Sequence, residues 1–292
     1  MGSLFSSSTS LRKSVRISDD EFVQLRDFIY DKSGIFVDIK RKYLFESRFS
    51  KRLAELGLPS FADYIKYLKF DTKKIDELAK LFELVTTNET SFCRDMKQLE
   101  AFQANVLKEK IDEQRKVGKK EINIWSAGCS SGEEPYTLAI LLHESLKMDL
   151  PSWNIKITAV DLSPAMIDRA KKGVYGEYAF KTTPDDIKNK YFSQDPGGWK
   201  IKPAVAKLVD FQQMNLNESA SLKRIARSHI VFCRNVIIYF DEDMKKRVVS
   251  SFYDNLMPGG YLMLGHSETL HKISSTFKPI YHPGTISYKK EG

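Results

Sequence analysis

A short apolar strand, a glycine turn and an acidic pair form the stretch of this sequence best suited to chemistry. Residues 122–125 read Ile-Asn-Ile-Trp, a pattern typical of a buried strand. Gly128 and Gly132 bracket the turn that follows, where backbone can approach a ligand closely. Glu133 and Glu134 then open a helix, where carboxylates complement the helix dipole. We expect a nucleotide-like cofactor at this strand end, although an ordinary strand–turn–helix corner would carry the same pattern.

This turn differs from two common phosphate-binding motifs. Its two glycines do not make G-x-G-x-x-G, and no Gly-Lys-Ser/Thr sequence follows them. The acidic pair would also repel a pyrophosphate at the start of the helix. The stretch therefore favours a cofactor that carries an ammonium or a sulfonium group.

The composition places the chain among folded proteins without membrane helices. Its 292 residues are enough for about two domains. No apolar run approaches the roughly 20 residues of a membrane helix, so we expect no stable membrane insertion and a cytoplasmic location. Residues 1–14 are Ser-rich and lack the apolar region of a signal peptide, which predicts a disordered tail.

The spacing of cysteines and histidines and the net charge indicate the compartment and the kinds of ligand and partner to expect. Three cysteines far apart in the sequence indicate a reducing compartment, and no histidine falls at a metal-ligand spacing, so we expect no metal. The formal net charge of +8 favours an acidic partner or nucleic acid. No nucleic-acid motif accompanies it, and we expect no nucleic-acid partner.

Periodic apolar residues predict a helical domain over residues 15–90. A capping box formed by Ser18 and Glu21 starts the first helix, and Gly57 ends the second. The second helix carries a basic stripe, made of Arg41, Arg48, Lys51 and Arg52. Such a stripe is usually a solvated face, and the alternative is docking to an acidic protein surface.

A polar junction and a connecting helix follow. Residues 86–95 read Thr-Thr-Asn-Glu-Thr-Ser-Phe-Cys-Arg-Asp, which suits either a capped linker or a ligand-contacting junction. The helix that starts at Met96 leads through an exposed connector to the central strand, so residues 91–120 are assigned as a linker.

The remaining residues, 121–292, alternate strands and helices as a doubly wound domain does. The strand over 154–160 ends at Asp161, in the position where an acid receives ribose hydroxyls. The strand over 209–214 ends at Asn215 and Leu216. The alternation fails near residues 181–208, which predicts a small antiparallel β insertion, and residues 277–288 predict a terminal hairpin.

Four motifs, in order, resemble the bacterial chemotaxis receptor methyltransferases of the CheR type. They are Thr86 to Arg94, Trp125 to Tyr136, Phe232-Cys-Arg-Asn-Val-Ile-Ile-Tyr-Phe240 and Gly265-His-Ser-Glu268. The resemblance implies a Rossmann-like methyltransferase domain with a small β-subdomain, preceded by an all-helical domain. It implies S-adenosylmethionine as the methyl donor, S-adenosylhomocysteine as the product, and glutamate side chains on the cytoplasmic domain of methyl-accepting chemotaxis receptors as the acceptors.

The resemblance also implies which residues form the site. Cofactor contacts would come from Asn88, Thr90, Arg94, Gly128, Glu133, Asp161, Asn215, Leu216, Cys233, Arg234 and Asn235. Arg94 and Tyr239 would orient the incoming carboxylate. The competing interpretation of Tyr239 is a core tyrosine whose hydroxyl is hydrogen-bonded within the protein. The basic stripe would register the acidic receptor helices. The short turn at residues 193–198 favours a chain that is not tethered to a receptor tail.

Two other functions fit the same residues. One is a methyltransferase that acts on RNA or a small molecule. The other is a signalling module that binds S-adenosylmethionine without turnover.

Overall fold

The computed structural model describes residues 15–292, so the predicted tail at residues 1–14 lies outside the described residues. The chain divides into two compact units. One holds the described residues up to 29 together with 37–85, and the other holds residues 30–36 and 86–292.

The first unit is helical. Its elements are α1 (Asp19–Ser33, whose last turn is grouped with the second unit), the 3-10 helix η1 (Ile39–Arg41), α2 (Lys42–Leu56), α3 (Phe61–Phe70) and α4 (Lys74–Val85). The predicted capping box is present, because the Ser18 amide donates to Glu21 Oε2 at 2.8 Å and the Glu21 amide donates to Ser18 Oγ at 3.2 Å. Gly57 ends α2 in the left-handed conformation, at φ +68°.

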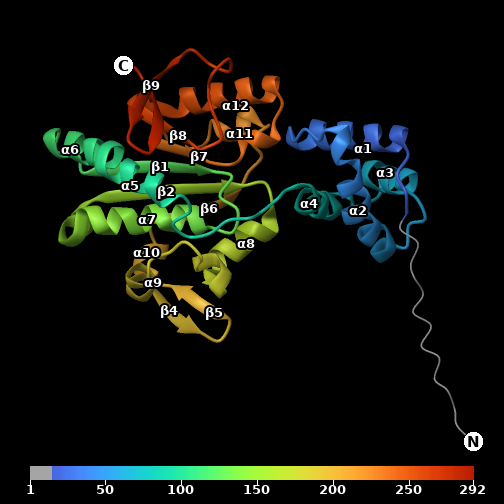
Figure 1. The fold of residues 1–292 in the computed structure, drawn as a ribbon, viewed down its shortest axis with the longest axis horizontal. Helices are drawn as coiled ribbons and strands as arrows, with labels where there is room; N and C mark the ends of the chain where they lie inside the picture. Colours follow the sequence, from blue (N-terminus) through green and yellow to red (C-terminus); the bar gives the residue numbers. More distant parts are fainter. Residues whose placement is uncertain (1–14) are drawn as a thin grey trace, which may run out of the picture. The chain divides into compact units, whose positions relative to one another are not determined.

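The second unit is built on a seven-stranded sheet of order β6-β2-β1-β7-β8-β10-β9 (Figure 1). The pairs among the first five strands are parallel, whereas β10 is antiparallel to both β8 and β9. Strand bounds are β1 (Glu121–Ala127), β2 (Asn154–Asp161), β6 (Val209–Gln213), β7 (Ser228–Cys233), β8 (Leu256–Leu264), β9 (Phe277–His282) and β10 (Thr285–Lys290). The chain leaves β1 for β2 on one side and returns to β7 on the other, which creates the crevice where doubly wound sheets bind ligands.

Helices cover both faces of this sheet because alternate strand residues point to opposite sides. On one face Trp125 packs edge-on against Phe252 of α12 (Glu242–Asn255), with ring centroids 4.9 Å apart. On the other face Phe102 packs against Phe232 of β7 at 4.8 Å. The connecting helix here is α5 (Met96–Ala101), a π-helical turn η2 (Phe102–Leu107) and α6 (Lys108–Lys116), and α7 (Glu133–Leu146) lies in the same core.

The small antiparallel sheet has the order β3-β5-β4 and lies beside the main sheet (Figure 1). The predicted turn joins β4 (Phe192–Asp195) to β5 (Gly198–Ile201). The sheet also takes in β3 (Val174–Tyr175), ahead of the expected insertion at about residue 181, because Val174 pairs with Lys200 and Tyr175 with Trp199. The helices between these elements are α8 (Pro164–Lys172), η4 (Glu177–Phe180), α9 (Asp185–Tyr191) and α10 (Pro203–Ala206).

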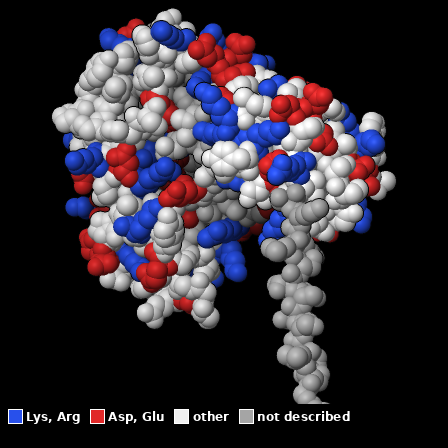
Figure 2. Space-filling view, turned by 45° about the vertical axis from the view of Figure 1, so that its right-hand side comes forward, with Lys and Arg blue, Asp and Glu red and all other residues white. Residues whose placement is uncertain are grey.

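Charged side chains of both signs are interspersed on the face drawn in Figure 2. Over residues 15–292, no helix combines the length and the hydropathy that a membrane crossing requires. The same residues hold no cluster of three or more His, Cys, Asp or Glu side chains that would bind a metal ion.

Candidate functional site

A pocket opens at the carboxyl ends of β1, β2, β6 and β7, within the second unit. Its empty volume is about 1040 Å³, part of it open to solvent. Most of its lining residues come from five segments far apart in the chain, within residues 86–94, 128–134, 160–162, 214–216 and 234–240. Ser33 and Ile35 line it as well. A concave site formed where parallel strands end is the usual place for a cofactor in such folds.

The glycine turn lies against the loop that follows β7. Gly128 has φ +79°, and a Cβ atom there would lie 2.4 Å from Val236 Cγ2, so a larger residue would separate the two segments. The amides of Gly128 and Cys129 both donate to the carbonyl oxygen of Val160, at 2.8 and 2.9 Å. The turn is therefore held by the end of β2 and by close packing at Val236.

Asp161 connects the glycine turn to the helix after β2. The Ser130 amide donates to its Oδ2 at 2.7 Å, and the Ser163 amide donates to its Oδ1 at 2.9 Å. Burial raises the pKa of this carboxyl, and the two backbone donors oppose that rise. A carboxylate oxygen can accept two hydrogen bonds, so Asp161 keeps acceptor capacity toward the pocket.

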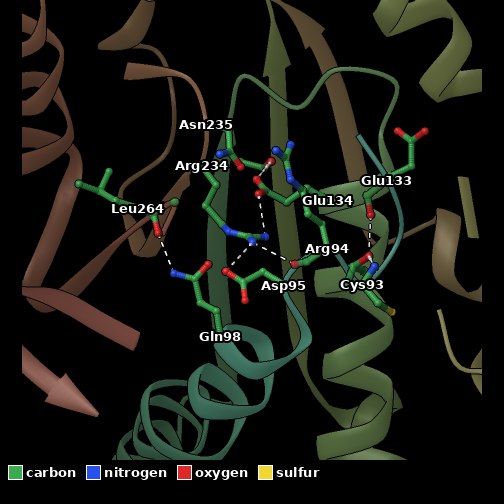
Figure 3. A network of polar contacts seen from close by, with 12 residues as sticks. Cys93, Arg94, Asp95, Gln98, Glu133, Glu134, Arg234, Asn235 and Leu264 are labelled. Carbon is green, nitrogen blue, oxygen red and sulfur yellow. Dashed lines mark hydrogen bonds and ion pairs between the residues drawn. The ribbon is translucent and has the colours of Figure 1, made fainter. Parts of the chain in front are cut away.

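An ion cluster forms the inner wall (Figure 3). The Arg234 side chain is 4% exposed, and its Nη1 lies 3.6 Å from Glu134 Oε2. Its Nη2 donates to the carbonyl oxygen of Arg94 at 2.9 Å and lies 3.9 Å from Asp95 Oδ2. Ser126 Oγ donates to Glu134 Oε1 at 2.9 Å. Burial raises the pKa of Glu134, and the Arg234 charge acts against it. Among the described residues, the buried Arg234 Nε has no partner.

The junction over residues 86–94 forms another wall of the pocket. Thr182 Oγ1 donates to the Phe92 carbonyl oxygen at 2.7 Å, and the Phe92 ring stacks on that of Phe180, with ring centroids 5.1 Å apart. This part of the junction is therefore held by η4 and the residues that follow it. The Arg94 guanidinium donates from Nη1 to the Glu89 carbonyl oxygen at 3.1 Å. Arg94 is thereby presented at the pocket by a segment without helix or strand.

The loop after β7 supplies several lining residues. The strand β7 ends at Cys233, and Asn235 then adopts the left-handed conformation at φ +59°, which turns the chain. Residues 237–239 then form a 3-10 helix, η5 (Ile237–Tyr239). This turn brings Tyr239 to the pocket, where its hydroxyl donates to the Thr87 carbonyl oxygen at 3.4 Å.

The structure brings most of the predicted site residues together. The lining contains Asn88, Thr90, Arg94, Gly128, Asp161, Asn215, Leu216, Arg234, Asn235 and Tyr239. Glu133 and Cys233 do not line the pocket. Glu133 is buried and accepts from Ser131 Oγ at 2.8 Å, and its neighbour Glu134 lines the pocket instead. Cys233 is fully buried in β7.

Two of the four residues in the predicted docking stripe are bound within the first unit. Arg52 forms a charged hydrogen bond from Nη2 to Glu77, and its Nε donates to Glu77 Oε1 at 3.0 Å. Arg48 donates from Nη1 to the Leu84 carbonyl oxygen at 2.8 Å. Arg41 and Lys51 are exposed. The stripe as predicted is therefore partly structural, because a helical spacing of seven and four gives no sign of partners on another helix.

Sequence reasoning missed Glu134, Val236 and Glu268 as determinants of the site. Glu268 accepts hydrogen bonds from the amides of Asn235 and Val236, at 2.7 and 3.0 Å. The sequence signal for Glu268 is its place in the motif Gly265-His-Ser-Glu268, and the sequence alone gives that glutamate no role.

Family models match both parts of the chain, and known proteins of the same family are similar to it over most of its length. Residues 20–86 match the family model described as CheR methyltransferase, all-alpha domain, and residues 88–285 match CheR methyltransferase, SAM binding domain. Chemotaxis protein methyltransferase 2 of Vibrio cholerae is 36% identical, over 89% of this chain and 89% of that protein. Chemotaxis protein methyltransferase of Borreliella burgdorferi is 35% identical, over 88% of this chain and 90% of that protein. The protein of that name from Vibrio anguillarum is 36% identical, over 93% and 98%.

Proposed function

Because this chain belongs to the CheR methyltransferase family, we propose that it methylates glutamate side chains of chemotaxis receptors, forming glutamate methyl esters. The chain is a methyltransferase that depends on S-adenosylmethionine, which supplies an electrophilic methyl group when bound. The observation that carries the proposal is the pocket in the SAM-binding domain, where Arg94, Asp161 and Tyr239 converge from three distant segments.

The chemistry of the lining fits this cofactor. A carboxylate such as Asp161 can accept from two ribose hydroxyls, and Arg94 can bind the carboxylate of the amino-acid end. Glu134 supplies negative charge near an ammonium group, and the unpartnered Arg234 Nε offers a further donor. Apolar lining residues, including Leu216, provide contacts for a purine ring.

The acceptor side of the proposal needs little proton chemistry. A glutamate carboxylate is ionised near pH 7, because its ordinary pKa is about 4.3, so no strong general base is required. Arg94 and Tyr239 would hold that carboxylate in line, and the residues of the pocket wall would exclude water from it. Alignment of two reactants in a dry site is worth a large part of the barrier in such reactions.

Receptor docking and location follow as parts of the same proposal. Arg41 and Lys51, both exposed, are proposed to face acidic receptor helices, where charge complementarity favours encounter. We also propose a cytoplasmic location. The domain limits 15–90, 91–120 and 121–292, taken from the sequence, are likewise proposed.

The test is transfer of label from methyl-labelled S-adenosylmethionine into membranes that contain the organism's own receptors. We expect alkali-labile label on a receptor-sized band, because glutamate methyl esters hydrolyse in base. Asp161→Asn serves as the control for a damaged cofactor site. Label in RNA or a small molecule, or cofactor binding with no transfer to any acceptor, would contradict the proposal.

A further inference from the structure

The buried carboxylate of Glu268 connects the loop after β7 to the end of β8. It accepts from four backbone amides, those of Asn235 at 2.7 Å, Val236 at 3.0 Å, Ile238 at 3.3 Å and Gly265 at 2.7 Å. Three of these donors belong to the loop that carries Asn235, Val236 and Tyr239 to the pocket. Glu268 itself is 9% exposed.

The surroundings of this carboxylate leave little room for an alternative arrangement. A Cβ atom at Gly265 would lie 2.7 Å from Glu268 Oε2 and 2.9 Å from the Asn235 amide nitrogen, so a glycine is needed where the carboxylate approaches the strand end. Asn235 is in the left-handed conformation, which costs free energy for any residue except glycine and persists only when its surroundings hold it.

The loop position then determines the position of the glycine turn. Val236, whose amide donates to Glu268, places its side chain where a Cβ atom on Gly128 would collide with it. A continuous series of contacts therefore runs from Glu268 through Val236 to the turn at Gly128. Displacement of the loop would alter the pocket on two walls at once.

We propose that Glu268 is a positioning residue for the cofactor pocket, and that it acts by holding the backbone of residues 235–238 against the turn at Gly128. Glu268 is not among the residues that line the pocket. A single carboxylate accepts from four amides, of which the Gly265 bond is buried and the other three are partly buried, and hydrogen bonds to a charged acceptor are among the stronger ones.

The test compares Glu268→Gln with Glu268→Asp and with Glu242→Gln. The glutamine keeps the size of the side chain but replaces one acceptor oxygen by an NH2 group, which faces amide donors. The aspartate keeps the charge on a shorter stem. Glu242 is an exposed acid in the first turn of α12, so Glu242→Gln is a matched change of charge outside the pocket wall.

Binding of S-adenosylhomocysteine is measured by calorimetry on the full chain, and amide hydrogen exchange is measured over residues 234–240. We expect Glu268→Gln to raise the Kd at least tenfold and to accelerate exchange in this loop, with partial recovery in Glu268→Asp and no change in Glu242→Gln. A variant with a lowered Tm but an unchanged Kd and unchanged loop exchange would show a purely structural role and overturn the proposal.

Two features keep the result interpretable. If Glu268→Gln does not fold, Gly265→Ala perturbs the same carboxylate from the other side and should raise the Kd in the same way; an unchanged Kd would contradict the proposal. The methylation of receptors is not part of the readout, and the inference rests on the proposed function only in its relevance to turnover. Failure of receptor labelling would therefore leave this test unaffected.

Discussion

Arg52 lies on α2 with its guanidinium against the buried carboxylate of Glu77, and its removal should destabilise the first unit strongly. The Glu77 side chain is 2% exposed and that of Arg52 is 21% exposed. Tyr64 also donates to Glu77 Oε1, at 2.7 Å, and burial raises the pKa of the Tyr64 hydroxyl, so it stays a donor. Arg52→Met keeps the apolar stem and removes the charge, which leaves Glu77 as a buried anion with the Tyr64 hydroxyl as its remaining close donor among these three.

The magnitude follows from the burial of the pair. Breaking a buried ion pair by removing one partner costs about 3–5 kcal/mol, and because water reaches Arg52 we take the lower end, about 3 kcal/mol. Since each 1.4 kcal/mol is a factor of ten in an equilibrium constant, amides that exchange through opening of this unit should exchange about a hundredfold faster.

Hydrogen exchange of residues 60–85 is the suitable assay, because all three tryptophans lie in the second unit and their fluorescence would not report on the first. Lys51→Met is the control, as Lys51 is an exposed cation on the same helix. In the double variant Arg52→Met with Glu77→Gln, part of the protection should return, because the unpaired charge is gone. If Arg52→Met exchanges no faster than Lys51→Met, the reasoning is refuted, and Arg52 would be free to serve in docking as the sequence predicted.

Three further predictions concern the pocket. Asp161→Asn places an NH2 group against the amide of Ser130 or Ser163, so the affinity for S-adenosylhomocysteine in calorimetry should fall by about ten- to a hundredfold, and unchanged affinity would contradict its role in holding the turn. Tyr239→Phe should lower kcat about tenfold at saturating cofactor with an unchanged Kd for S-adenosylhomocysteine, and full turnover would remove Tyr239 from the acceptor site. Burial raises the pKa of Glu134 above the ordinary value of a glutamate, so its contribution to stability is present below that ordinary value and is lost as the pH rises through the raised pKa. Chemical denaturation at several pH values should show this decline in the parent chain and a flatter dependence in Glu134→Gln; an unchanged slope would show that the carboxyl titrates as it does in the unfolded chain.

Local signals in the sequence predicted the elements of the fold well, because their causes are local. The Ser18–Glu21 capping box and the Gly57 helix end each depend on residues three or four apart, and both are present in the structure. The CheR methyltransferase family and the two kinds of domain, predicted from four motifs, are confirmed by the family models. The strand β3 was missed because two residues carry too little pattern to distinguish a strand from a loop.

Features that depend on three-dimensional packing were not predictable in the same way. The sequence analysis named Glu133 as a cofactor contact, whereas its neighbour Glu134 lines the pocket in the structure. The rotation of α7 about its axis decides which of the two faces the pocket, and the sequence does not give this rotation. The buried partner of Arg52, Glu77, lies 25 residues away in the chain, and the amides of Asn235, Val236 and Ile238 lie 30 to 33 residues from Glu268, so no spacing rule connects them. Side chains that position the site from distant parts of the chain could therefore not be predicted from the sequence, and they are seen only in the three-dimensional structure.

The three thiols offer a probe of how the second unit opens. Cys93, Cys129 and Cys233 are 5%, 1% and 0% exposed, and all belong to that unit. Burial raises the pKa of each, so the reactive thiolate is scarce in the native state. An alkylating reagent would modify these thiols mainly during transient opening of the second unit. The rate of alkylation would then measure how often the Rossmann-like part exposes its interior. The helical part contains no cysteine, so its opening would not contribute to this rate.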